Sequence, residues 1–257
     1  MSAPPVLEGA EPWSSSGGLN GALVLHGFTG SPQSMRGLAH AFASAGFAVE
    51  LPLLPGHGTT VDDMITTGWD EWSAAAESAY VDLASRCERV VVAGLSMGGA
   101  LTAWLASRHS EIAGIVAVNP VAAAATDPLR EMFDELVATG ATTIPGIGSD
   151  IADPEQSELA YTETPLGPIR SMFDALAELQ SAYADIRCPL LLMNAPQDHV
   201  VSPADSDHLA ASVSGPVERI PLERSFHVAT LDFDRELIET EAVAFARRVC
   251  AERVGGA

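Results

Sequence analysis

Short apolar runs alternate with longer amphipathic stretches along most of this chain. The runs are rich in β-branched residues, which is typical of strands buried on both faces, and they cover residues 21–26, 47–51, 89–93, 115–119, 190–194 and 217–221. The stretches between them have apolar residues at helical spacing and cover residues 34–45, 69–87, 99–109, 168–184, 204–213 and about 234–252. This alternating order predicts a mostly parallel central sheet with helices on both faces.

One connection, from residue 121 to residue 186, is about twice as long as a single crossover helix with its loops requires. It contains an amphipathic helix over residues 127–139 and a stretch rich in Pro and Gly over residues 143–154. We interpret residues 121–167 as a cap over the carboxyl edge of the sheet, inserted in a single domain that spans residues 1–257. The cap's apolar residues either line an acyl pocket or pack within the cap: Leu129, Met132, Phe133, Leu136, Ile144 and Ile147.

Composition narrows the classes of function. The chain has 13 basic residues against 34 acidic ones, for a net charge of −21, which argues against binding to nucleic acid or to an anionic membrane surface and favours neutral substrates. It contains no lysine, which excludes Schiff-base chemistry, pyridoxal-phosphate attachment and a Walker lysine. Its three cysteines are widely spaced, so neither a disulfide framework nor a zinc site is indicated. We expect no metal and no cofactor.

The ends and apolar runs of the chain bear on its location. The first residues lack a basic segment followed by an apolar run, and no later stretch has the length of apolar sequence that a membrane span needs. We therefore expect a cytoplasmic protein without integral membrane association.

The pattern Gly-x-Ser-x-Gly over residues 94–98 gives the first candidate chemistry. It lies between a predicted buried strand and a predicted helix, which is the context of a nucleophile elbow. Such a turn strains the backbone of its apex residue and needs small neighbours, which Gly94, Gly98 and Gly99 supply. The apex serine also lies at a helix N-terminus, where unpaired N–H groups favour developing negative charge. We therefore predict that Ser96 is a nucleophile.

A serine nucleophile needs a base and an acid, and in this kind of fold the acid and then the histidine follow the serine along the chain. Asp198 comes just after the predicted strand 190–194, whereas Asp205 and Asp207 lie beside or within a helix. Asp198 is therefore the predicted acid. His227 follows the predicted strand 217–221 and is the predicted base.

The other histidines fit catalysis less well. Three fall on predicted helix surfaces, His199 adjoins the predicted acid, and two precede the serine in tight glycine turns: His40, His109, His208, His199, His26 and His57. His26 begins the loop 26–30, which follows a strand, and we expect its side chain to brace that loop. Such a loop provides one oxyanion donor and the residue after the nucleophile provides the other. The N–H groups of Phe28 and Met97 are the predicted donors.

With these residues assigned, the sequence resembles the bacterial monoacylglycerol lipase and carboxylesterase family of α/β-hydrolases over nearly its whole length. The motifs that carry the resemblance are PVLEGAEPW from Pro5, HGFTGSP from His26, GHGT from Gly56, GLSMGG from Gly94, IGSD from Ile147, ELAY from Glu158, QDHVV from Gln197 and FHVATLD from Phe226. The resemblance implies the α/β-hydrolase fold and the same nucleophile, acid, base and oxyanion donors. It adds Glu158 as a sensor of the glycerol hydroxyls and Ile147 as a determinant of substrate specificity.

The sequence thus predicts a cofactor-free serine hydrolase that cleaves carboxylic esters through an acyl-enzyme, with monoacylglycerols as substrates. A general carboxylesterase for short to medium acyl esters is the main alternative. A thioesterase, an acyltransferase or an aminopeptidase would use the same three residues. A non-catalytic binding module on this scaffold would be expected to lack one of them, and here all three positions are filled.

Overall fold

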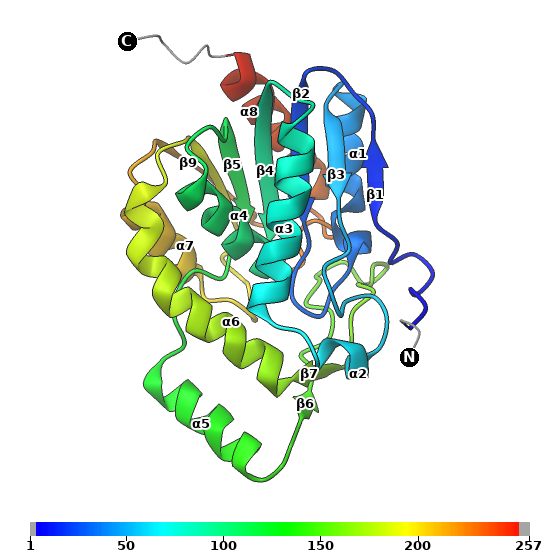
Figure 1. Ribbon diagram of the computed structural model, residues 1–257, viewed down its shortest axis with the longest axis vertical. Helices are drawn as coiled ribbons and strands as arrows, with labels where there is room; N and C mark the ends of the chain where they lie inside the picture. Colours follow the sequence, from blue (N-terminus) through cyan, green and yellow to red (C-terminus); the bar gives the residue numbers. More distant parts are fainter. Residues whose placement is uncertain (1–3, 252–257) are drawn as a thin grey trace.

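The computed structural model describes residues 4–251 and has a seven-stranded sheet at its centre (Figure 1). The strand order is β1-β3-β2-β4-β5-β8-β9, and their bounds are Trp13–Ser15, Ala48–Leu51, Asn20–Leu25, Arg89–Leu95, Gly114–Val118, Leu190–Asn194 and Val217–Pro221. All neighbours pair in parallel except β1, which is antiparallel to β3. The predicted mostly parallel sheet is confirmed, and β1 is an additional edge strand that the apolar pattern does not reveal because it is short and polar.

Helices cover both faces of the sheet, as predicted. One face packs against α1 (Arg36–Ser44) and α8 (Arg235–Ala251). The other face packs against α3 (Trp69–Ala84), α4 (Met97–Arg108) and α7 (Pro203–Ser212), and α6 (Leu166–Leu179) packs on α3 and extends the same hydrophobic core. Three short helical segments are also present, η1 (Pro32–Met35), α2 (Val61–Met64) and η2 (Gln180–Asp185). Helix 168–184 was expected to be continuous, but its last turn is the 3-10 segment η2.

The two faces of the sheet have separate hydrophobic cores because side chains alternate along each strand. Leu23, Val92 and Ile115 point into the core under α3 and α4, whereas Val24 and Val116 point into the core under α1 and α8. All five are fully buried. This double burial explains why the central strands appear in the sequence as continuous apolar runs.

The segment between β5 and α6 lies beyond the carboxyl ends of the parallel strands, at the bottom of Figure 1. It contains α5 (Asp127–Ala138) and a two-stranded hairpin of β6 (Thr143–Pro145) and β7 (Glu163–Pro165). Helix α5 packs on α6, where the rings of Phe133 and Phe173 lie 5.8 Å apart. Two ion pairs flank the rings, Arg130 with Asp174 and Arg170 with Asp134.

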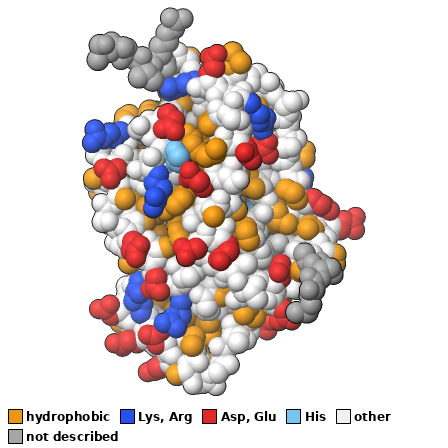
Figure 2. All heavy atoms as spheres, in the orientation of Figure 1, with side chains coloured by type: hydrophobic (Ala, Val, Ile, Leu, Met, Phe, Trp, Pro, Cys, Tyr) orange, Lys and Arg blue, Asp and Glu red, His pale blue; other side chains and the backbone are white. Residues whose placement is uncertain are grey.

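Acidic side chains are spread over the whole visible face of the molecule, with few arginines between them (Figure 2). This distribution agrees with the net charge of −21. Among residues 4–251, no helix is both long and apolar enough to cross a membrane.

Candidate active site

Ser96 is the apex of the turn that joins β4 directly to α4. Its backbone has φ 57° and ψ −117°, a strained conformation for a residue with a side chain. The turn depends on its glycines, since a Cβ on Gly94 would lie 2.1 Å from the carbonyl oxygen of Gly98, and one on Gly98 would lie 2.2 Å from that of Leu25. The Ser96 side chain therefore stands at the N-terminus of α4, at the carboxyl edge of the sheet.

Asp198 and His227 come together from the loops that follow β8 and β9. A carboxylate oxygen of Asp198 lies 2.7 Å from Nδ1 of His227, and the two side chains are only 2 % and 9 % exposed. The other carboxylate oxygen of Asp198 accepts hydrogen bonds from the N–H groups of Val200 and Val201, both at 2.8 Å. The Asp198 carboxylate is therefore fixed by its own loop, and it holds the imidazole of His227 through Nδ1.

Asn119 connects this pair to Ser96. The N–H of Ser96 donates to the carbonyl of Val118 at 3.0 Å. The next residue, Asn119, donates through its side-chain amide to the carbonyl of His227 at 2.7 Å and accepts from the N–H of Ala195 at 2.7 Å. Asn119 is 2 % exposed and has φ 42°, which an asparagine tolerates better than most residues.

The sequence reasoning missed Asn119, although a polar residue directly after a buried strand is a usable signal. Within residues 4–251, no hydrogen bond joins Ser96 Oγ to His227. Such bonds are often long in a resting enzyme and tighten when substrate binds.

The predicted oxyanion donors lie beside Ser96. A Cβ on Gly27 would lie 3.4 Å from Cβ of Ser96, so the loop that contains Phe28 passes directly next to the serine. Within the described residues, the N–H groups of Phe28 and Met97 make no backbone hydrogen bond, and their role as oxyanion donors stays a prediction. The loop is braced by His26, as predicted: its ring contacts the carbonyl of Gly27 at 2.9 Å and accepts from the N–H of Leu54 at 3.1 Å.

Glu158 lies at the same edge, next to the oxyanion loop. A Cβ on Gly30 would lie 2.6 Å from a carboxylate oxygen of Glu158. Burial raises the pKa of Glu158, and the nearby His227 and the hydroxyl of Ser34 only partly offset that effect. The structure thus brings Glu158 together with the base and the oxyanion loop.

Ile147 is not part of this group. Its residue surface is 70 % exposed, so it lies outside the buried site rather than within an apolar slot. Met132 of α5 is likewise 44 % exposed, whereas Phe133 is buried against α6.

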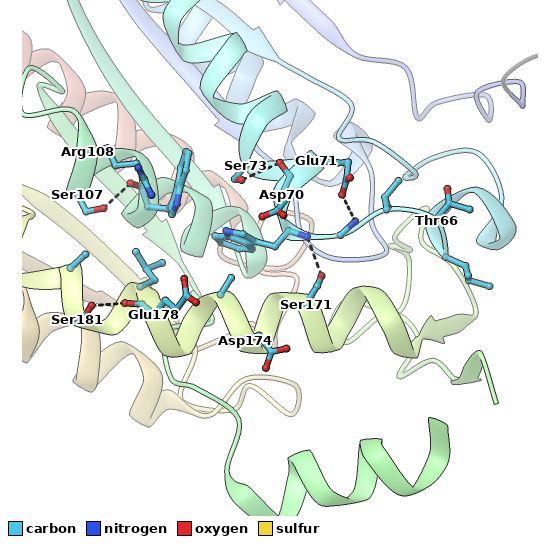
Figure 3. Close-up of a pocket in the computed structure, with 18 residues that line it drawn as sticks. Thr66, Asp70, Glu71, Ser73, Ser107, Arg108, Ser171, Asp174, Glu178 and Ser181 are labelled. Carbon is cyan, nitrogen blue, oxygen red and sulfur yellow. Dashed lines mark hydrogen bonds between the residues drawn. The ribbon is translucent and has the colours of Figure 1, made fainter. Parts of the chain in front are cut away.

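A groove of about 850 Å³ lies between α3 and α6, near the end of α4, and contains none of the predicted site residues (Figure 3). Its rim carries Asp70, Glu71, Asp174 and Glu178 (Figure 3), which does not suit an acyl chain. Glu71 is already used as a helix cap, since it accepts from the N–H of Gly68 at 2.9 Å.

Comparison with known proteins gives a consistent result. The family model described as "Serine aminopeptidase, S33" matches residues 21–232. The thermostable monoacylglycerol lipase of Bacillus sp. (strain H-257) is 41% identical over 248 residues, covering 94% of this chain and 96% of that protein. The carboxylesterase of Bacillus subtilis (strain 168) is 25% identical over 248 residues, covering 93% of this chain and 97% of that protein.

Solved structures agree. A structure from a study of LipS and LipT, two metagenome-derived lipolytic enzymes, is 40% identical with a TM-score of 0.90 and covers 95% of this chain and 100% of that chain. This confirms the α/β-hydrolase fold. The chain therefore belongs to the serine aminopeptidase S33 family of hydrolases, and its relatives place it among the serine ester hydrolases of that family.

Proposed function

We propose that this enzyme hydrolyses monoacylglycerols through an acyl-enzyme formed on Ser96. The observation that carries the proposal is the 2.7 Å hydrogen bond between Asp198 and His227, at the same sheet edge as the strained elbow of Ser96. Ser96 attacks the ester carbonyl while His227 takes its proton, and Asp198 stabilises the imidazolium that forms. The N–H groups of Phe28 and Met97 hold the oxyanion of the tetrahedral intermediate.

The second half of the reaction uses the same groups. His227 protonates the departing glycerol oxygen, which leaves the acyl group on Ser96, and then removes a proton from the water that releases the fatty acid. Glu158 accepts hydrogen bonds from the glycerol hydroxyls. A partly buried acceptor of this kind disfavours esters that leave it unpaired, so it selects glycerol over simple alkyl alcohols.

We assign residues 121–167 to a cap within a single domain, residues 1–257. Two hydrogen bonds support this assignment, because they tie the later half of the segment to the oxyanion loop and to η1. The N–H of Tyr161 donates to the carbonyl of Thr29 at 3.1 Å, and that of Leu159 donates to the side chain of Gln33 at 3.0 Å. A cytoplasmic location stays a prediction from the sequence.

A general carboxylesterase is the second candidate. The observation that favours it is the exposure of Ile147, because a specificity residue on the surface does not confine an acyl chain. The carboxylesterase of Bacillus subtilis is also a relative.

Substitution of the nucleophile tests the reaction class. Ser96→Ala removes the attacking oxygen and should lower kcat on a monoacylglycerol by about 10⁴-fold or more, with an unchanged thermal unfolding midpoint. Ser85→Ala, at the exposed end of α3, is the matched control and should keep full activity. Activity that survives in Ser96→Ala would remove Ser96 from the mechanism.

A substrate panel tests the choice of ester. Monoacylglycerols should exceed methyl esters of the same acyl chain in kcat/KM by about 10-fold to 100-fold, the value of one hydrogen bond to a charged group. Equal values would reduce the assignment to a general carboxylesterase. An aminoacyl anilide in the same panel tests the peptidase activity for which the family model is described.

A further inference from the structure

Asp150 is the last residue of the IGSD motif, residues 147–150. The proposed mechanism assigns it no role. The residue lies in the cap segment, yet its side chain is only 12 % exposed. Its carboxylate contacts both loops that carry the acid and the base.

One oxygen of this carboxylate bonds to both loops. Oδ2 accepts a hydrogen bond from the backbone N–H of His199 and another from the backbone N–H of His227, each at 3.1 Å. Oδ1 lies 2.8 Å from Nδ1 of the His199 ring, and the carbonyl of Asp150 accepts from the N–H of Val228 at 3.0 Å. Four contacts therefore converge on one residue of the cap.

These contacts bear directly on the distance between acid and base. His199 adjoins Asp198, and His227 is the base of the proposed mechanism. The two N–H groups that bind Oδ2 of Asp150 therefore belong to the two loops whose side chains, Asp198 and His227, form the hydrogen bond. The loops follow different strands, and the sheet register does not fix their separation beyond the strand ends. Hydrogen bonds to a carboxylate are short-range and strong, so Asp150 limits how far the loops separate.

The segment that carries Asp150 is itself fixed by hydrogen bonds to Asp232. Asp232 is fully buried, and it accepts from the N–H groups of Ala152 at 2.7 Å, Asp153 at 3.0 Å and Phe226 at 2.9 Å. The cap segment and the His227 loop thus exchange carboxylate-to-backbone bonds in both directions. These hydrogen bonds fix the position of Asp150 relative to the rest of the domain.

We propose that Asp150 is a positioning residue, which holds the Asp198 loop and the His227 loop at the separation that their hydrogen bond needs and thereby couples the cap to the catalytic machinery. This inference rests on the proposed function, because it assumes that Asp198 and His227 act on Ser96. It assigns Asp150 no contact with substrate.

The test compares two substitutions at this position. Asp150→Ala removes every side-chain contact and should lower kcat by about 100-fold, the effect of a misplacement of about 1 Å, while KM changes less than about threefold. Asp150→Asn keeps an amide oxygen for the two N–H groups and offers an NH₂ to the other tautomer of His199. It should restore kcat to within about fivefold of the parent enzyme.

Controls separate this role from folding. Glu155→Ala, an exposed acid of the same segment, should leave kcat unchanged. His199→Ala keeps both backbone bonds and should cost several-fold less than Asp150→Ala. If Asp150→Ala does not fold, Asp150→Ser replaces it with the same expected loss, because its hydroxyl is too short to reach both loops.

Three results would overturn the proposal: a normal kcat in Asp150→Ala, a loss confined to KM, or an Asp150→Asn variant as impaired as Asp150→Ala, which would indicate an effect of charge instead of position. Ser96→Ala is measured in parallel. If it keeps activity, the proposed function fails; if it is inactive while Asp150→Ala is normal, only the role of Asp150 fails.

Discussion

In the proposed function, Glu158 is the residue that recognises the alcohol group of the ester. It lies against the oxyanion loop at Gly30 and close enough to His227 for the imidazole to influence its pKa. Burial raises that pKa, and hydrogen-bond donors stabilise a carboxylate that is partly removed from water. The hydroxyls of a glycerol ester are donors of the right kind.

Glu158→Ala should therefore affect substrates unequally. We expect kcat/KM for a monoacylglycerol to fall by about 10-fold to 100-fold, because the hydroxyls lose their acceptor. The value for a methyl ester of the same chain should change less than about threefold. Parallel kinetics with both esters check this, and Glu163→Ala, an exposed acid of β7, is the matched control. An equal loss on both esters would mean that Glu158 supports the site and does not recognise glycerol.

The sequence predicts some residues of the site and not others for a physical reason. Ser96 follows β4 directly, and Asp198 and His227 lie in the loops that follow β8 and β9, so the sequence order of strands and polar residues predicts all three. Asn119 and Asp150 act through hydrogen bonds to residues 108 and 77 positions away, and such pairings exist only after folding. Ile147 was expected to shape the substrate slot, but the surface position of this side chain depends on how the cap folds.

At the scale of elements, the turn from β4 to α4 requires glycine because backbone atoms occupy the space of a side chain. Gly94→Ala would place a Cβ 2.1 Å from a carbonyl oxygen, and backbone at the centre of the sheet moves little. We expect a loss of about 2 kcal/mol or more in the free energy of unfolding and of about 100-fold in kcat, since the elbow shifts.

Gly167→Ala is the matched control for this substitution. No atom lies within 4 Å of the Cβ that it would add, at the start of α6. It should increase the free energy of unfolding by about 0.5–1 kcal/mol and leave kcat unchanged. Denaturant unfolding with both variants checks the pair. If the two substitutions have equal effects, the elbow is not sterically restricted.

Long buried strands are predictable from the sequence pattern, whereas short strands at the surface are not. The central strands are buried on both faces and appear as apolar runs, so they were predicted within a few residues. The hairpin of β6 and β7 was missed, because its strands are three residues each and only partly buried. A Pro/Gly-rich stretch such as residues 143–154 gives no periodicity from which a strand is recognised.

The whole molecule should lose stability in mild acid because two histidines are buried side by side. The rings of His26 and His57 lie 4.9 Å apart, and both are fully buried. Burial lowers the pKa of His26 from 6.5 to about 4, and burial together with His26 lowers the pKa of His57 as well. Between pH 6.5 and pH 4 the unfolded chain binds more protons than the folded one. The free energy of unfolding therefore has its full value above pH 6.5 and falls as the pH decreases toward 4.

His26 alone should account for a loss of about 3 kcal/mol in the free energy of unfolding between pH 6.5 and pH 4. His26→Gln should be less stable than the parent at pH 7 but should lose less stability between pH 7 and pH 4. His40→Gln, which changes an exposed histidine, should follow the parent curve. Chemical denaturation at a series of pH values checks this. Parallel curves for the parent and His26→Gln would show that His26 does not set the acid sensitivity.

The central claim is that Ser96 is the nucleophile, and labelling with a fluorophosphonate followed by mass spectrometry tests it most directly. Trypsin releases residues 90–108 as one peptide, which contains Ser96 and Ser107, and fragmentation distinguishes them. We predict one adduct per folded chain, on Ser96, with none in Ser96→Ala. A folded protein that takes up no label, or one labelled at another residue, would contradict the account.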